Sequence, residues 1–311
     1  MLRFAKLADR PRKLYRMTGL TQEQFALLTD RLKPLWTEAE QERLSRPDRK
    51  RAIGAGRKYT LSCMEDKLLV LLAFYRFYLT DELLGWMFGL DQSNMCRLRH
   101  KLEPLLEKAA DPSLRIPLRL KVPPGAKKIS TWEELLKVCP DFADVVTDAT
   151  EQPRQRPQRR QRRWYSGKKK RHTIKAQITA NARGEVLEVS ASHPGRVHDY
   201  RIFQHEGTAG ALPSACFHFA DLGYDGAQWD YPDRTMILPF KRRRNHRRLT
   251  RFERRFNRWH ARVRIRVEHT LSRMKKYQVL AQIWRHRIAG YNQAFRNVAA
   301  LNNFRLATVP V

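Results

Sequence analysis

The stretch from Lys241 to Lys276 constrains the fold most, because its apolar residues recur at helical spacing within dense positive charge. Its apolar positions are Phe252, Phe256, Trp259, Val263, Val267, Leu271 and Met274. Steps of three and four residues predict one long amphipathic helix. The stretch holds sixteen Lys or Arg residues and only two acids, Glu253 and Glu268. Glu253 can pair with arginines one turn away, whereas Glu268 is either a salt-bridge partner of Arg264 or a metal ligand.

The composition favours a polyanionic partner. The chain has 311 residues and a formal net charge of +31, far more than solubility requires. The charge is clustered, which argues against a merely solvated cationic surface and favours nucleic acid. The length allows one large domain or two modest ones.

Cysteine spacing and hydropathy indicate an intracellular, cytoplasmic protein. The four cysteines form no CxxC pair, so neither a zinc module nor a disulfide framework is predicted. The longest apolar run, Leu68 to Leu79, is too short to span a bilayer and contains Arg76. We therefore expect no membrane partner.

The N-terminal third has helical signals. Thr21 and Gln24 form a capping-box pair ahead of a helix that Pro34 should bend or limit. Residues 41–60 are basic, contain two glycines and are typical of a linker. The apolar segment from about Ser62 to Tyr78 predicts a helix at the centre of a small bundle.

Two further helices are separated by a short glycine-containing turn. Thr80 can cap the first, which ends at Gly89, and Asp91 can cap the second. This order is that of a helix-turn-helix, although an ordinary three-helix bundle fits the pattern equally well. The net charge favours the DNA-binding alternative. Three residues of the second helix would then face outward and contact DNA: Asn94, Arg97 and Lys101.

The C-terminal half alternates strands and helices. Prolines and a glycine mark residues 111–131 as a linker, followed by a short helix that Thr131 caps. Strands are expected over residues 144–148, 172–180, 185–191, 217–221 and 235–240, and a last helix over 290–308. We therefore predict two domains, an all-α domain over residues 1–110 and an α/β domain over residues 132–311.

Two acids end predicted strands, Asp148 and Asp221. In open α/β sheets that edge binds ligands, because side chains there project from a rigid frame. Carboxylates brought together repel one another, and a hard divalent cation with oxygen ligands relieves the repulsion. Glu268, delivered from the basic helix, would supply a third carboxylate.

Five motifs occur in order: VVTDATEQPRQRP, YSGKKKRHTIK, HPGRVHDYRIF, FHFADLGYDG and RIRVEHTLSRMKKY. Together they resemble the DDE transposases of bacterial insertion sequences, in the branch that shares its endonuclease domain with Harbinger elements. The resemblance covers residues 132–304 and, more weakly, the N-terminal helices. It implies a ribonuclease-H-like fold, with Asp148, Asp221 and Glu268 as catalytic acids that hold Mg²⁺ or Mn²⁺, as two ions.

The basic helix matches a finer pattern of that family: Tyr, two residues, Arg, three residues, Glu, six residues, Lys. Arg264, Glu268 and Lys275 fit it, and Ala261 stands at the tyrosine position. No tyrosine role is therefore carried over. We expect Arg264 and Lys275 to hold DNA phosphates beside the acid.

Residues 154–171 carry too many like charges to pack without a partner. Following Asp148 directly, they predict an exposed arm that binds DNA phosphates in a salt-dependent way. Its cations include Arg159, Arg160, Arg162, Arg163, Lys168, Lys169 and Lys170. Trp164 and Tyr165 either stack on unpaired bases or anchor the arm.

Other polar residues near these motifs have plainer interpretations. Asp225 fits a turn better than a metal site, and Glu151 could support the nearby Asp148. His198 and Asp199 either help to order the site or cap the helix that starts there.

The expected function is that of a DNA transposase of the bacterial nucleoid. It would hydrolyse a phosphodiester at each element end and join the 3′ end to target DNA by transesterification. The partners would be double-stranded DNA, as terminal inverted repeats and target, and a second copy of the chain in a homodimer or larger synaptic assembly. Two alternatives remain: a metal-dependent nuclease without strand transfer, and a non-catalytic DNA-binding protein descended from a transposase.

Overall fold

The computed structural model describes residues 1–45, 52, 59–111, 144–211, 216–242 and 248–308. The chain divides into two compact units, called here the helical unit and the sheet unit. The helical unit comprises Met1–Pro112, Lys275–Gln282 and Gln293–Val311, and the sheet unit comprises Ser113–Met274 and Ile283–Asn292. The predicted linker beyond Asp111 and the helix capped by Thr131 lie outside the described residues. The predicted domain limits, 1–110 and 132–311, stay a prediction.

The helical unit is built from helices joined by short turns. Its elements are η1 (Phe4–Lys6), α1 (Pro11–Thr18), α2 (Gln22–Leu44), α3 (Met64–Phe77), α4 (Asp81–Phe88), α5 (Gln92–Ala110), η6 (Gln278–Leu280) and α12 (Ile288–Ala307) from Gln293 onward. The capping box is confirmed, since Thr21 accepts from the Gln24 amide and the Gln24 side chain accepts from Thr21.

Helix α2 does not end at Pro34 and continues to Leu44. Trp36, beyond the proline, lies under the ammonium groups of Lys67 at 5.4 Å and Lys101 at 5.9 Å. These cation–π contacts from α3 and α5 help to hold the second half of α2 in place.

Helix α3 lies at the centre of this unit, as its apolar sequence predicted. Residues 68–75 are all buried with no measurable exposure. The buried Tyr75 hydroxyl accepts a hydrogen bond from Asn297 Nδ2 at 2.6 Å, and the same amide donates to Glu103 O at 2.9 Å. The polar groups inside the bundle are thus paired, as burial requires.

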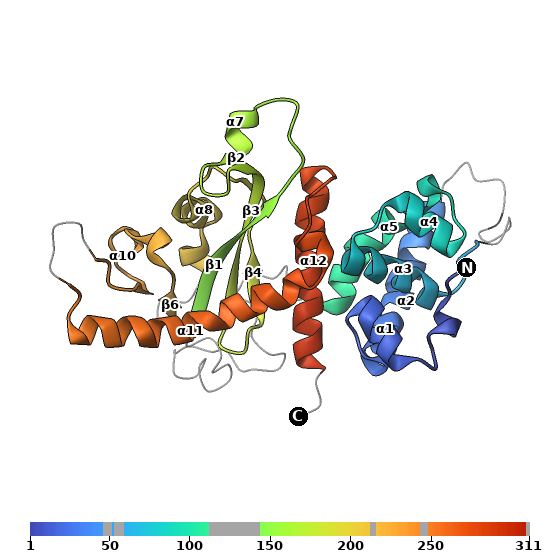
Figure 1. The fold of residues 1–311 in the computed structure, drawn as a ribbon. Helices are drawn as coiled ribbons and strands as arrows, with labels where there is room; N and C mark the ends of the chain where they lie inside the picture. The colour runs from blue at the N-terminus through green and yellow to red at the C-terminus, as the bar shows by residue number, and fades with distance from the viewer. Residues whose placement is uncertain (46–51, 53–58, 112–143, 212–215, 243–247, 309–311) are drawn as a thin grey trace. The chain divides into compact units, whose positions relative to one another are not determined.

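The sheet unit contains one seven-stranded mixed sheet (Figure 1). Its strands are β1 (Asp144–Pro153), β2 (Tyr165–Ser166), β3 (Arg171–Asn181), β4 (Val186–Val189), β5 (His193–Pro194), β6 (Phe217–Phe219) and β7 (Thr235–Ile237). The main order is β2-β3-β1-β6-β7, with β4 and β5 also pairing to β3. β3 is antiparallel to β1, whereas β6 and β7 run parallel to it. The turn expected between β3 and β4 is present, with Gly184 at a φ of +80°.

Helices lie on both faces of this sheet. The helical elements are α7 (Gln161–Trp164), α8 (Asp199–Glu206), α9 (Thr208–Ala211), η5 (Leu222–Tyr224), α10 (Ala227–Asp230) and α11 (Arg251–Lys275). His218 of β6 contacts Phe203 of α8, with ring centroids 5.2 Å apart, and the next residue, Phe219, contacts Trp259 of α11 at 5.5 Å. Successive strand residues point to opposite faces, so α8 and α11 cover opposite sides of the sheet.

The basic stretch forms α11, the helix that crosses the sheet in Figure 1. Four of its seven predicted apolar positions are buried: Val263, Val267, Leu271 and Met274. At its N-terminal end Phe252 and Trp259 stay 70% and 45% exposed. The helical periodicity is confirmed, and the buried part of the stripe is the part that carries Glu268.

Candidate active site and nucleic-acid interface

Asp148 lies in the middle of β1, not at its end. The sequence predicted a strand that stops at Asp148, but β3 pairs with β1 as far as Pro153 opposite Thr173. The parallel pairing with β6 is shorter and ends at Val146 opposite Phe219. Asp148 and Asp221 each follow that last pair by two residues, so both stand just beyond the paired part of two neighbouring strands.

The Asp148 carboxyl is in an acidic, partly desolvated environment. Burial raises its pKa to about 6, and the carboxylates of Asp221 and Glu268 act in the same direction. The Arg264 guanidinium and a hydrogen bond from the Ala149 amide, at 2.9 Å, oppose this rise. Two of the acids predicted from the sequence, Asp221 and Glu268, are therefore within electrostatic reach of the third, Asp148.

Asp221 is held by the turn that follows β6. Its Oδ1 accepts a hydrogen bond from the Gly223 amide at 2.7 Å and caps the short helix η5. A Cβ at Gly223 would lie 2.7 Å from Asp221 Oδ1 and 3.7 Å from Asp199 Oδ2. A side chain at this position would therefore displace the Asp221 carboxylate from its hydrogen bond to the Gly223 amide.

Glu268 projects from α11 beside Arg264. The Arg264 Nη2 atom is 3.6 Å from Glu268 Oε1, and the Glu268 side chain is 54% exposed. Arg264 Nε is buried and has no hydrogen-bond partner in the described part of the chain. The oxygens of Asp148, Asp221 and Glu268 do not form a group within 4.8 Å of one another among the described residues. Arg264 reaches both Asp148 and Glu268 electrostatically.

A fourth carboxylate, Asp199, belongs to the same region. Lys175 Nζ of β3 donates to Asp199 Oδ1 and to Val197 O, both at 2.8 Å. Asp199 starts α8, while His198 precedes it without a side-chain capping bond. Asp199 was considered from the sequence, but Lys175 was missed. Its signal was a single charge in the middle of the alternating strand HTIKAQITA.

A buried phenol, Tyr224, lies within electrostatic reach of these acids. It is fully buried, and its hydroxyl donates to Gln177 Oε1 at 3.0 Å. Burial raises its pKa well above the usual value, and Asp148, Asp199 and Asp221 add to the effect. Tyr224 is therefore a neutral phenol, hydrogen-bonded to Gln177 and within electrostatic reach of these acids.

Two other acids near the motifs have structural partners. Asp225 Oδ2 pairs with Lys241 Nζ at 3.2 Å and is about half exposed, which fits the predicted turn. Glu151 Oε1 accepts a short hydrogen bond from Thr173 Oγ1. On β1, Glu151 points to the sheet face opposite that of Asp148, because the two differ by an odd number of residues.

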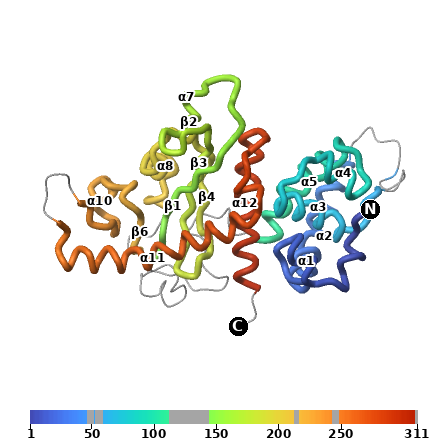
Figure 2. The backbone as a smooth tube through the Cα atoms, in the orientation of Figure 1, coloured from blue at the N-terminus to red at the C-terminus, as the bar shows by residue number. Residues whose placement is uncertain are grey.

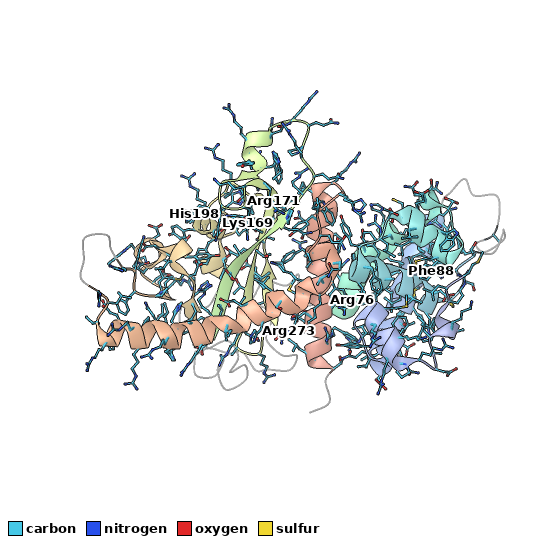
Figure 3. The ribbon with its side chains drawn as sticks, in the orientation of Figure 1. Arg76, Phe88, Lys169, Arg171, His198 and Arg273 are labelled. Carbon is cyan, nitrogen blue, oxygen red and sulfur yellow. The ribbon has the colours of Figure 1, made fainter. Side chains whose placement is uncertain are left out.

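The basic arm over residues 154–171 extends past the end of β3, where Figure 2 shows α7 and β2. Seven side chains of the arm are exposed and make no ion pair among the described residues: Arg159, Arg160, Arg162, Arg163, Lys168, Lys169 and Lys170. Trp164 lies over Arg154, with the guanidinium carbon 4.4 Å from the ring centroid, so it anchors the arm. Tyr165 is 41% exposed and meets His172 edge-on. In Figure 3, Lys169 and Arg171 appear toward the same end of the sheet as His198.

In the helical unit, α4 and α5 are joined by a tight turn. Gly89 ends α4 at a φ of +75°, and the Asp91 side chain caps α5 by accepting from the Asn94 amide at 2.9 Å. A Cβ at Gly85 would lie 2.4 Å from Leu90 O, so only glycine allows the turn to approach α4 this closely. These capping predictions are confirmed.

The three predicted DNA-contacting residues of α5 differ in exposure. Asn94 and Arg97 are exposed, and Arg97 Nη1 donates to Asn94 Oδ1 at 2.8 Å. Lys101 is half-buried and pairs with Glu40 of α2 at 3.0 Å. It therefore stabilises the bundle, which the helical spacing alone could not show. Buried Arg99, paired with Asp81 and Glu103, holds α4 against α5.

Comparison with known proteins supports these observations. The family described as DDE superfamily endonuclease matches residues 147–303, about half of the chain, and the helix-turn-helix of DDE superfamily endonuclease matches residues 59–112. The chain belongs to the DDE superfamily of endonucleases. The predicted class is confirmed: a ribonuclease-H-like α/β domain preceded by a helix-turn-helix.

Two relatives carry transposase names. A protein of Microchaete diplosiphon, named as a probable transposase for insertion sequence element IS702, is 29% identical over 297 residues, 95% of each chain. A protein of Streptomyces albus G, named "Putative transposase for insertion sequence element IS112", is 25% identical over 300 residues, 96% of this chain and 97% of that one. No solved structure matches. The predicted relationship to insertion-sequence transposases is confirmed.

Across the described residues, the helices are all too short or too polar to cross a membrane.

Proposed function

We propose that this protein is a transposase that cuts the ends of an insertion sequence and joins the 3′ ends to target DNA. The observation that carries the proposal is the acid arrangement. Asp148 and Asp221 follow the last residue pair of two parallel strands, and Glu268 of α11 is within electrostatic reach. An endonuclease family assignment and two relatives with transposase names support the same reading.

Asp148, Asp221 and Glu268 would hold the divalent cations, Mg²⁺ or Mn²⁺, as two ions. The donors fit, because carboxylate oxygens are the ligands that such hard cations take. Burial is the main cause of the raised pKa of Asp148, and the carboxylates of Asp221 and Glu268 add to it, so a bound cation would stabilise the ionised carboxylate. When bound, the ions activate the attacking oxygen and stabilise the leaving oxygen of a phosphodiester.

The chain's own groups would orient and grip the substrate. The Gly223 amide fixes the direction of Asp221, and Lys175 fixes Asp199 beside it. Arg264 offsets the negative charge of Asp148 and Glu268, and its partly exposed side chain would bind a DNA phosphate. The arm cations would bind the DNA backbone, because they lack protein partners in the described structure. Lys275, exposed as the last residue of α11, would add a phosphate contact.

The helix-turn-helix would recognise the terminal inverted repeats through α5. Asn94 and Arg97 are exposed near its N-terminal end, the part of a recognition helix that reaches base edges. Joining two element ends requires both to be held at once, so we propose a homodimer or larger synaptic assembly acting at the bacterial nucleoid. The sheet unit would supply the chemistry and the helical unit the end recognition.

One assay separates the three functions compatible with this site. The full chain would be incubated in Mg²⁺ or Mn²⁺ with element ends, either intact or already cleaved at the 3′ strand, and with supercoiled target. A transposase cleaves the intact end and joins the pre-cleaved end to the target. Nicking without joining would identify a nuclease and overturn the strand-transfer proposal. Binding without cleavage in either metal would identify a non-catalytic DNA-binding protein.

A further inference from the structure

A second group of metal-ligating side chains lies away from the three acids. His193 of β5 and His205 and Glu206 of α8 place one ligand atom each within 4.8 Å of the other two. It is the one such group reported for the described part of the chain. None of the three residues belongs to the acid arrangement, and no function described so far uses them.

The two imidazoles converge on one carboxylate oxygen. His193 Nε2 is 2.7 Å from Glu206 Oε1, and His205 Nδ1 is 3.7 Å from the same atom. Ligands of a tetrahedral zinc ion, each at about 2.0–2.1 Å, lie roughly 3.3 Å apart. The two observed separations bracket that value, so small side-chain movements would bring the three atoms to a common ion.

The carboxylate is held in the required direction. Glu206 Oε2 accepts a hydrogen bond from the Ala191 amide at 3.2 Å, which leaves Oε1 facing the histidines. Such a contact to the free oxygen is the kind of support that orients ligands in metal sites. The rings of His193 and His205 stand edge to face, with centroids 5.3 Å apart.

His205 distinguishes a metal site from a plain His–Glu pair. The hydrogen bond between His193 and Glu206 is enough to fasten α8 to β5. His205 adds nothing to that bond, because its Nδ1 is too far from Glu206 for a hydrogen bond, and its side chain is 76% exposed. The His205 imidazole is exposed and faces the Glu206 carboxylate, which already pairs with His193. In this position His205 can act as the third ligand of a metal ion.

We propose that His193, His205 and Glu206 form a zinc-class cation site that fastens the C-terminal end of α8 to β5. Two imidazoles and a carboxylate are a donor set that Zn²⁺ takes, with a water in the fourth position, whereas Mg²⁺ prefers oxygen ligands alone. The site therefore differs in metal class from the three acids.

The position of the site suggests what it stabilises. His193 is the cross-strand partner of Lys175, whose ammonium holds Asp199 at the first residue of α8. Lys175 thus fixes the start of α8, and the cation would fix its end. The helix that carries Asp199 beside Asp221 would be held at both ends.

Metal titration of the full chain tests the site. Chelator-treated protein in millimolar Mg²⁺ would be titrated with Zn²⁺, followed by calorimetry, and with Co²⁺, followed by its visible absorption. We expect one equivalent of tight binding and a tetrahedral Co²⁺ spectrum. His205→Ala should weaken Zn²⁺ binding by at least about 100-fold, since it removes a direct ligand from a site where indirect support alone is worth 10–100-fold. Because the His205 side chain is exposed, its removal should leave the fold intact, and His205→Gln provides a second variant.

Two controls make the result specific. His269→Ala removes an exposed imidazole of α11 outside the group and should leave Zn²⁺ binding unchanged. Asp221→Asn removes an acid of the candidate active site and should also retain the zinc, so that the two sites succeed or fail separately. Equal Zn²⁺ affinity in the wild type and both His205 variants, or no Zn²⁺ binding by the wild type, would overturn the proposal.

Discussion

Two regions of the sheet unit carry opposite charge: one contains neighbouring acids, and the other contains exposed cations. On β1, after β6 and on α11, the carboxylates of Asp221 and Glu268 act electrostatically on the buried carboxyl of Asp148, and the Arg264 guanidinium opposes them. In the arm over residues 154–171, seven cations are exposed and have no acidic partner in the described structure. The first region carries excess negative charge on the sheet and on the helix that covers it. The second carries excess positive charge on an exposed segment beyond the sheet.

The difference lies in what holds each region. Asp148 sits on β1 opposite Ile178 of β3, and Asp221 accepts a hydrogen bond from the Gly223 backbone amide. The arm is held by a two-residue strand and by Trp164 over Arg154. Chemistry needs fixed distances, whereas contact with a DNA backbone tolerates adjustment. We infer that the three acids take part in DNA cleavage and that the arm binds the DNA backbone.

The strongest test of this division removes one acid. Asp221→Asn should lower end cleavage by at least roughly 10⁴-fold, the scale of losing a catalytic carboxylate, because the amide cannot supply the same charge. DNA affinity should change by less than about threefold, since the arm is untouched. Cleavage would be measured by gel assay in Mg²⁺ and affinity by fluorescence anisotropy.

Asp225→Asn is the matched control, because Asp225 is four residues away, exposed and paired with Lys241. It should cleave at nearly the wild-type rate. If Asp221→Asn also cleaved normally, or if both variants lost activity equally, Asp221 would leave the proposed site.

The second test removes charge from the arm. Substituting Arg159, Arg160, Arg162 and Arg163 by Gln should weaken DNA binding by about 10³-fold at low salt, taking about 1 kcal/mol for each charged contact. The slope of log affinity against log salt should fall by roughly three to four, at about 0.9 per phosphate contact. Anisotropy titrations at several salt concentrations give both values.

Gln substitutions at Arg12, Lys13 and Arg16 of α1, which are also exposed, remove comparable charge elsewhere. They should change the salt slope much less than the arm variant. Equal effects of the two sets would mean that net charge, and not the arm, governs binding.

Local sequence signals predicted much of this arrangement. The caps at Thr21, Thr80 and Asp91, the hairpin at residues 181–184 and the helix around Glu268 depend on neighbours a few residues away. Such signals are visible in the residues themselves. Asp148 and Asp221 were found because both lie near strands and both recur in family motifs.

Features set by distant partners were not predictable. β1 continues past Asp148 because β3 pairs with it, and no residue between Ala149 and Pro153 reveals that partner. Lys175 pairs with Asp199 across 24 residues, and Lys101 with Glu40 across 61. Charge and helical spacing predicted that Lys101 would face outward. The packing of α2 against α5 shows instead that Lys101 pairs with Glu40 of α2.

The third test measures the cost of burying the Asp148 carboxyl near two other acids. A pKa of about 6 for Asp148, against its usual 3.8, means that the folded state binds this proton more tightly than the unfolded state. The stabilisation is complete below about pH 4 and is lost as pH rises through about 6. The difference corresponds to roughly 2–3 kcal/mol at about 1.4 kcal/mol per pKa unit.

Asp148→Asn should therefore be more stable than the wild type at pH 7 by up to that amount, and nearly equal to it at pH 4. Urea unfolding in a chelator at both pH values measures the free energy of unfolding. Asp225→Asn should keep the wild-type pH dependence. If the wild type gained stability relative to Asp148→Asn between pH 4 and pH 7, this would contradict the raised pKa of Asp148.

For the arm, we proposed that cations without an acidic partner contact DNA. The last test asks whether the same holds for helix α5. Arg97 is exposed, and among the described residues its side chain bonds to neutral Asn94 and to no acid, whereas Lys101 pairs with Glu40. Arg97→Ala should lower the preference for element ends over random DNA by about tenfold, within the roughly 1–3 kcal/mol of a base contact. Lys101→Ala should leave that preference nearly unchanged and lower stability slightly, because its charge is already used inside the protein. Competition binding with end and random duplexes measures the preference. A larger loss from Lys101→Ala than from Arg97→Ala would show that pairing within the free protein does not decide which cations reach DNA.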